Sequence, residues 1–256
     1  MKIFSCVVAF ALIGSTLAPA ARAGVDPLVA EPAAAAPKSD KDLPGGIGLD
    51  WSVGYDSHYI FHGEQLLRNT FWSEVSFDLP LTKNLSLNLT PWFLQAADDD
   101  YNEFDLTGTL TLALGPWEFG IAGAEFYYPR RSLGGGEGTR DEQEMTVTIS
   151  RGFGPLTATV LGAYSFSREG FYYEASAEYE IAVNDSLSLT PCAVIGADTD
   201  YFGDGTDTNH VGLTLTAAYK PLPWCTFSPY VAGNFPTGHL DTGNMLFGGI
   251  KLTVTF

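Results

Sequence analysis

The sequence predicts an all-β protein, a transmembrane antiparallel up-and-down β-barrel of about 12 strands with short periplasmic turns and longer extracellular loops. Three observations lead to this fold. Apolar and polar residues alternate along the chain from residue 46, the connections between alternating segments are short and long in turn, and the chain ends on an alternating apolar segment that closes with Phe256. Alternate residues of a strand face opposite sides, so the alternation predicts a sheet with one apolar face.

The alternation is visible in each predicted strand. The first strand has Trp51, Val53 and Tyr55 on one parity and Ser52 and Asp56 on the other, and no helical period fits these runs. The predicted strands lie at or around residues 47–61, 70–79, 85–90, 103–114, 117–127, 145–149, 156–166, 171–181, 187–195, 211–219, 227–231 and 246–256. This count of 12 is even, as in single-chain bacterial barrels.

The connections predict which end of each strand faces outward. The short ones, 81–84, 115–116, 151–154, 183–185 and 221–223, are rich in Gly, Pro, Asn and Asp, which favour tight turns. The longer, polar ones are 63–69, 96–102, 129–142, 167–170, 198–209 and 235–244. Outer-membrane barrels carry their short turns on the periplasmic side, so we expect the longer loops outside the cell.

Aromatic residues are expected to form girdles at the two ends of the strands, as in membrane barrels. The candidates are Trp117 and Trp224 after short turns, and Tyr59, Tyr101, Tyr127 and Tyr173 near the outer ends. A secreted β-sandwich is the alternative all-β fold. It would bury its apolar face in a dry core and has no need of aromatic residues at both ends of its strands.

The chain before the strands divides into two parts. Residues 1–23 are typical of a secretory signal peptide, with Lys2, an apolar stretch and a small-residue cleavage site at Ala21-Arg22-Ala23. Residues 24–45 have the Ala- and Pro-rich composition of a flexible periplasmic linker. We therefore expect a barrel over residues 46–256, reached after signal-directed export to the outer membrane of a Gram-negative cell.

Charge and hydropathy exclude several classes. The chain has 13 basic against 30 acidic residues, and removing Lys2 and Arg22 with the leader leaves a formal charge of −19. Such an acidic chain repels phosphate backbones, so nucleic acid is not an expected partner. Beyond the leader, no run approaches the roughly 18 apolar residues that a membrane-spanning helix needs.

The parity opposite the apolar one predicts the lining of the lumen. It is acidic, and Lys251 is the one clear base within its strands. Carboxylates that line a water-filled channel attract cations and repel anions, which predicts a passive, cation-favouring pore for small hydrophilic solutes. Alternatively, these acids form a solvated polar face, or they pair with loop arginines in a closed barrel. The predicted lining residues are Asp50, Asp56, Glu74, Asp78, Glu103, Asp105, Glu118, Glu144, Glu174, Glu178 and Glu180.

The longest loop, 129–142, carries Arg130, Arg131 and Arg140. It is the candidate either to fold inward as a constriction or to contact anionic lipopolysaccharide outside the cell. Exposed, solvated charge is the third interpretation.

The last strand places Leu252, Val254 and the terminal Phe256 on one parity. It resembles the C-terminal targeting strand of bacterial outer-membrane proteins, whose final Phe is read by the barrel-assembly machinery. That resemblance implies the assembly machinery and outer-membrane lipid as partners.

The segment from Tyr55 to Gly63 resembles the opening strand of the TorF-like porins, in which a Tyr-x-Phe-Arg-Gly pattern ends the strand. Tyr59, Phe61 and Gly63 match that pattern, whereas His62 stands where the family has Arg. Chain size, leader, strand number and final Phe agree over the whole mature chain. The resemblance implies an outer-membrane barrel and names no ligand.

No catalytic residue, metal site or cofactor is predicted. Ser57 and His58 are the one adjacent Ser-His pair, and neighbouring residues of a regular strand face opposite sides. Cys192 and Cys225 are expected two strands apart, which favours unbridged buried thiols over a disulfide. A closed structural or adhesive barrel that displays its loops without transport is the alternative function.

Overall fold

The computed structural model describes residues 46–130, 141–203, 205–238, 240 and 243–256. The predicted signal peptide and linker, residues 1–45, lie outside the described residues. The strands are β1 (Gly48–Phe61), β2 (Glu64–Pro80), β3 (Leu85–Ala96), β4 (Asn102–Leu114), β5 (Trp117–Arg130), β6 (Glu142–Phe153), β7 (Leu156–Ser165), β8 (Gly170–Tyr179), β9 (Ile181–Asn184), β10 (Leu187–Thr199), β11 (Thr206–Leu222), β12 (Cys225–Pro236) and β13 (Met245–Thr255). In this part of the chain, no helix is long and apolar enough to cross a membrane.

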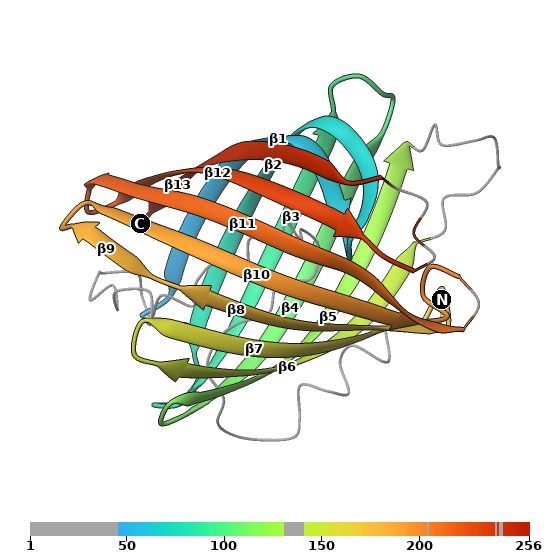
Figure 1. Ribbon diagram of the computed structural model, residues 1–256. Coiled ribbons are helices and arrows are strands. Elements are labelled where there is room, and N and C mark those ends of the chain that lie inside the picture. The colour runs from blue at the N-terminus through green and yellow to red at the C-terminus, as the bar shows by residue number, and fades with distance from the viewer. Residues whose placement is uncertain (1–45, 131–140, 204, 239, 241–242) are drawn as a thin grey trace.

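The strands form one closed antiparallel barrel (Figure 1). Each pairs with its neighbour along the chain, and β13 closes the barrel on β1, with Val254 opposite Trp51. Strands β8 and β9 are separated only by Glu180, and both pair with β10, so together they make one strand of the wall. The barrel therefore has 12 wall strands, as the sequence predicts.

The two faces of the wall differ as the alternation predicts. On β4, Thr107, Thr109 and Thr111 face inward and are at most 2% exposed, whereas Phe104 and Leu106 on the other parity are 41% and 50% exposed. An antiparallel barrel with an apolar outer band and a polar interior matches a lipid-facing surface around a polar lumen.

The aromatic girdles are confirmed only in part. Four of the six predicted girdle residues are exposed: Trp117, Trp224, Tyr127 and Tyr173. Tyr59 and Tyr101, however, are 2% and 3% exposed and lie inside the barrel. The prediction for Tyr59 and Tyr101 was wrong because the chain leaves the regular wall at both positions: Tyr101 precedes β4, and Tyr59 belongs to a hairpin that turns into the lumen.

This hairpin also replaces the long loop predicted at residues 63–69. Strand β1 pairs with β13 only as far as Asp56, opposite Gly249, and β2 pairs with β3 only from Thr70, opposite Ala96. The segment between them, residues 57–69, pairs only with itself, and we call it the inner hairpin. Its two connecting residues are His62 and Gly63, so residues 64–69 are strand and not loop.

Local backbone conformation explains the shape of the inner hairpin. His62 and Gly63 both have positive φ, 49° and 83°, as the two central residues of a type I′ turn require. At the other end Asn69 also has positive φ, 49°, and accepts a hydrogen bond from the hydroxyl of Tyr55 at 2.7 Å. Because Asp56 and Tyr59 are both buried although they are three residues apart, the alternation shifts by one between them, and the hairpin side chains past this point turn inward.

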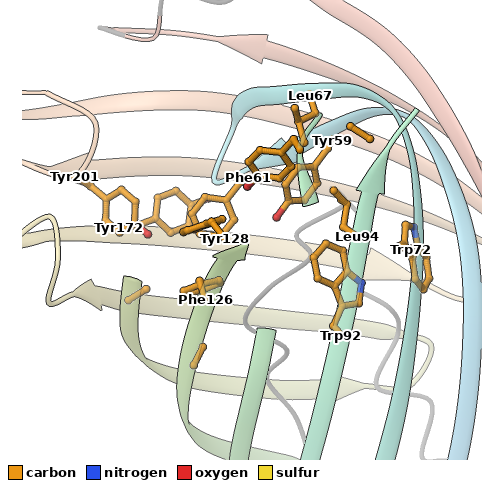
Figure 2. Close-up of a cluster of buried hydrophobic side chains, with 14 residues drawn as sticks. Tyr59, Phe61, Leu67, Trp72, Trp92, Leu94, Phe126, Tyr128, Tyr172 and Tyr201 are labelled. Carbon is orange, nitrogen blue, oxygen red and sulfur yellow. The ribbon is translucent and has the colours of Figure 1, made fainter. Parts of the chain in front are cut away.

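The inner hairpin packs on a mainly aromatic cluster inside the barrel (Figure 2). Its Tyr59, Phe61 and Leu67 lie against Trp92 and Phe126 of the wall, and all five are at most 6% exposed. Burying such a side chain is worth roughly 1.5–3 kcal/mol, so this contact holds the hairpin inside the barrel.

Candidate pore and its constriction

The predicted lumen acids differ in burial, and all but Glu180 lie within a strand of the wall. Glu180 is exposed at the break between β8 and β9. The half-buried ones are Asp50, Asp78, Glu118 and Glu174. The buried ones are Asp56, Glu74, Glu103, Asp105, Glu144 and Glu178. Six carboxylates are therefore buried inside the barrel, on five different strands, and each has its own surroundings.

Asp56 is held where the inner hairpin leaves the wall. The indole Nε1 of Trp72 donates to one of its carboxylate oxygens at 2.6 Å, and the hydroxyl of Tyr230 donates to the other, also at 2.6 Å. Short hydrogen bonds to a carboxylate are strong, so Asp56 joins β1, β2 and β12 at the base of the hairpin.

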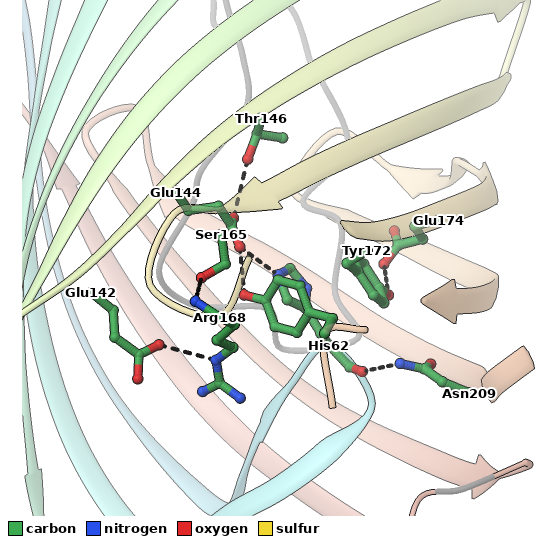
Figure 3. Close-up of polar contacts among 10 residues, drawn as sticks. His62, Glu142, Glu144, Thr146, Ser165, Arg168, Tyr172, Glu174 and Asn209 are labelled. Atoms are coloured by element: carbon green, nitrogen blue, oxygen red, sulfur yellow. Dashed lines mark hydrogen bonds and ion pairs between the residues drawn. The ribbon is translucent and has the colours of Figure 1, made fainter. Parts of the chain in front are cut away.

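The tip of the inner hairpin reaches the opposite wall (Figure 3). His62 Nε2 lies 3.2 Å from Glu144 Oε2 on β6, and its ring stacks on Tyr172 of β8 with centroids 3.9 Å apart. The amide of Asn209 on β11 donates to the carbonyl of His62 at 2.9 Å, and Asn234 on β12 donates to the carbonyl of Gly63 at 2.7 Å. Four wall strands thus hold one turn across the lumen.

Side chains around Glu144 stabilise this contact. The hydroxyl of Tyr201 donates to Glu144 Oε2 at 2.6 Å, and the hydroxyl of Thr146 donates to Oε1 at 3.2 Å. Burial, and next the charge of Glu144, raise the pKa of the Tyr201 phenol well above its ordinary value, so Tyr201 remains a donor. Arg168, in the β7–β8 loop, contacts Glu142 at 3.2 Å.

Gly63 is required at the tip for a second reason besides its φ. A Cβ at this position would lie 2.3 Å from Nδ1 of the buried His210. The turn therefore fits against β11 without space for a side chain. The sequence carried a signal for this turn in the His62-Gly63 pair, but the wall residues that receive it are far away in the chain.

The structure describes the predicted assembly residues but only one of the three predicted constriction arginines. Arg130 is the last residue of β5, and Arg131 and Arg140 lie outside the described residues, so an inward position of that loop stays a prediction. Leu252 and Val254 lie in β13, which pairs with β1, and the backbone N–H of Phe256 donates to the carbonyl of Leu49 at 3.0 Å. The C-terminal segment is therefore part of the barrel seam.

The Ser57-His58 geometry differs from the prediction. Ser57 Oγ lies 3.2 Å from His58 Nδ1, although neighbours on a regular strand face apart. The two meet because this is where the hairpin leaves the wall. Ser57 Oγ also accepts the N–H of Gly248 at 3.1 Å and so attaches the hairpin base to β13. Cys192 and Cys225 are thiols and form no disulfide.

Comparison with known proteins identifies the fold. The chain matches no family model and no curated protein. Among solved structures it is similar to the COG4313 outer membrane channel from Pseudomonas putida F1, with a TM-score of 0.59 and 12% identity over 86% of this chain and 99% of that one. It is also similar to the KdgM porin, with a TM-score of 0.50 and 8% identity over 82% of this chain and 99% of that one. The NanC porin matches with a TM-score of 0.50 and 12% identity over 81% and 98%. At these identities the likeness establishes the barrel fold.

Proposed function

We propose that this protein is a porin-like, cation-favouring pore of the outer membrane that passes small hydrophilic solutes. The observation that carries the proposal is the acidic inner wall of a barrel whose fold is that of outer-membrane channels. Its similarity to solved structures named as channels and porins supports the proposal, as does the resemblance of the opening strand to TorF-like porins.

The outer surface supports a place in a lipid bilayer. Large apolar side chains on every wall strand face outward, such as Val160 at 60% and Leu213 at 51% exposure. A water-soluble protein rarely leaves so continuous an apolar surface uncovered, because burying it is favourable. Lipid chains would cover it, with the outward Trp and Tyr residues at the two interfaces. Arg130, Arg131 and Arg140 are proposed contacts to lipopolysaccharide at the outer edge.

The balance of charge in the lumen supports cation preference. Six carboxylates are buried on the inner wall. Among the described basic residues, Lys251 lies near Asp56, His62 contacts Glu144, and Arg168 pairs with Glu142, which is not one of the six. Fixed negative charge in a narrow polar channel concentrates cations and excludes anions. The inner hairpin narrows the outer half of the lumen, which limits the pore to small solutes.

The same hairpin favours a second candidate, a closed barrel that displays its loops. Its aromatic side chains fill the outer half of the lumen, and Tyr59 and Tyr172 are at most 2% exposed. In this case the carboxylates would hold the hairpin in place and would not select ions.

Planar bilayer recording separates the two candidates. The refolded full-length barrel is inserted into a bilayer with a tenfold KCl gradient, and the reversal potential is measured. Defined current steps with a reversal potential on the cation side are expected. Anion preference would contradict the charge argument, and a complete absence of steps from folded, inserted protein would establish the closed barrel.

A further inference from the structure

A single row of the inner wall alternates carboxylates with aromatic rings. Across β2 to β6, Glu74 lies opposite Trp92, Trp92 opposite Asp105, Asp105 opposite Phe126, and Phe126 opposite Glu142. Side chains directly opposite in an antiparallel sheet have Cβ atoms about 5 Å apart, so each ring lies between two carboxylates. We call these five residues the acid-aromatic row.

Two side chains at the centre of this row are buried with little compensation from protein groups. Among the described residues, the neighbouring carboxyl group of Glu103 interacts with the carboxyl group of Asp105, and no acceptor is found for the indole N–H of Trp92. The two side chains are 0% and 3% exposed. Because Glu103 is itself an acid, it brings no positive charge to Asp105. A buried carboxylate that has no basic partner is unfavourable unless a proton, a cation or a ligand compensates its charge.

The inner hairpin covers the same row. The ring of Tyr59 lies 6.0 Å from that of Trp92, and Phe61 meets Phe126 edge to face at 5.9 Å (Figure 2). The hairpin therefore packs on the two aromatic members of the row, one on each side of Asp105. At the far end, Glu142 is already paired with Arg168.

We propose that Glu74, Trp92 and Asp105 bind an organic cation that carries primary amines on a short alkyl chain. Ammonium groups would donate to the carboxylates, and the alkyl chain and the charge would lie on the ring of Trp92, since aromatic faces attract cations. Strands are about 4.8 Å apart, so Glu74 and Asp105, two strands from each other, suit a diamine with its charges roughly 10 Å apart. The ligand reaches the row when the inner hairpin lifts from it.

This inference deepens the proposed function and rests on it, because a solute must be able to enter the lumen. It turns a general preference for cations into a site with a defined chemistry. An inorganic cation such as K⁺ would interact with the carboxylates alone, whereas the proposed ligand also contacts an aromatic ring.

The test uses calorimetric titration of the folded barrel in detergent with hexamethylenediamine. Hexanediol and adipate, the neutral and anionic six-carbon compounds, serve as size-matched comparisons. We expect saturable binding of the diamine alone. Binding of hexanediol with the same affinity, or no binding of the diamine, would overturn the site.

Variants locate the site. Asp105→Asn is expected to weaken diamine binding at least tenfold, and Trp92→Leu to weaken it severalfold, whereas Trp92→Phe keeps a ring and most of the affinity. Glu125→Gln is the matched control, because Glu125 lies next to Phe126 on β5 but on the outer face, where it bonds Gln143 at 2.8 Å. Circular dichroism checks that each variant is folded. An unchanged affinity in Asp105→Asn would refute the proposal.

The same proteins in planar bilayers separate this inference from the proposed function. Diamine binding without ionic current would refute the pore and leave the site in place. Ionic current without diamine binding would refute the site and leave the pore in place.

Discussion

The contact between His62 and the far wall should control the current through the barrel. His62→Ala removes a hydrogen bond to the carboxylate of Glu144 and a ring stack on Tyr172, both of them buried. A hydrogen bond to a charged group is worth about 1.5–3 kcal/mol, and an aromatic stack about 0.5–1.5 kcal/mol. The backbone hydrogen bonds from Asn209 and Asn234 remain, so the hairpin is loosened and not lost.

Together these contributions suggest a loss of about 2–4 kcal/mol for the docked position of the inner hairpin. Since about 1.4 kcal/mol changes an equilibrium tenfold, the ratio of docked to undocked hairpin should fall roughly 30-fold to several hundredfold. The undocked hairpin leaves more of the outer lumen open. His62→Ala should therefore raise the mean current and the fraction of time in the highest conductance level.

Single-channel recording at fixed voltage measures both quantities. His58→Ala is the matched control, because His58 lies at the base of the hairpin, where its ring contacts Phe247 at 6.0 Å and not the far wall. Its current should stay close to that of the wild type. A double-mutant cycle with Glu144→Ala should show strong non-additivity, since the two side chains act through one contact. Wild-type current levels and dwell times in His62→Ala would refute a role of the hairpin as the constriction.

Three further predictions test the wall, its charge and its seam. Val160→Lys, in the middle of the outer face of β7, should lower the free energy of unfolding in liposomes by about 2–4 kcal/mol, whereas Thr159→Lys on the inner face should lower it much less; equal losses would contradict the assignment of faces. Replacing Asp78 and Glu178 together by Asn and Gln should move the reversal potential toward zero, and an unchanged potential would show that these inner-wall carboxylates do not select ions. Deletion of Phe256 should reduce the amount of heat-modifiable barrel in outer-membrane fractions, while refolding in detergent stays near wild type; normal assembly in cells would exclude the C-terminal signal.

Most of the wall could be predicted because it depends on local pattern. On β4 the alternation of threonine with apolar residues is present in the sequence, and a strand whose successive side chains face opposite sides must sort them between lipid and lumen. Flanking polar residues extend the strands beyond the predicted cores, as in β6, which runs from Glu142 to Phe153 and not only over 145–149. These ends were missed because backbone pairing continues where the apolar pattern has stopped.

The lumen acids could be assigned to a face but not to a role. Asp56 and Asp105 both lie inside the barrel, yet two hydrogen bonds from Trp72 and Tyr230 hold Asp56, whereas Asp105 has a second acid, Glu103, beside it. What surrounds a lumen side chain comes from several strands at once. Parity along one strand therefore cannot distinguish a carboxylate that supports the fold from one left open to a solute.

The sequence by itself determined the barrel, its strand number and the acidity of its inner face, because each follows from the period of one strand and the lengths of the connections. Only the tertiary structure decided that the inner hairpin turns into the lumen and fills part of it. His62 meets a partner 82 residues away, and the carbonyls of His62 and Gly63 accept from residues 147 and 171 positions away. Such contacts exist only once the sheet has closed, since closure is what brings β6, β11 and β12 opposite the hairpin tip.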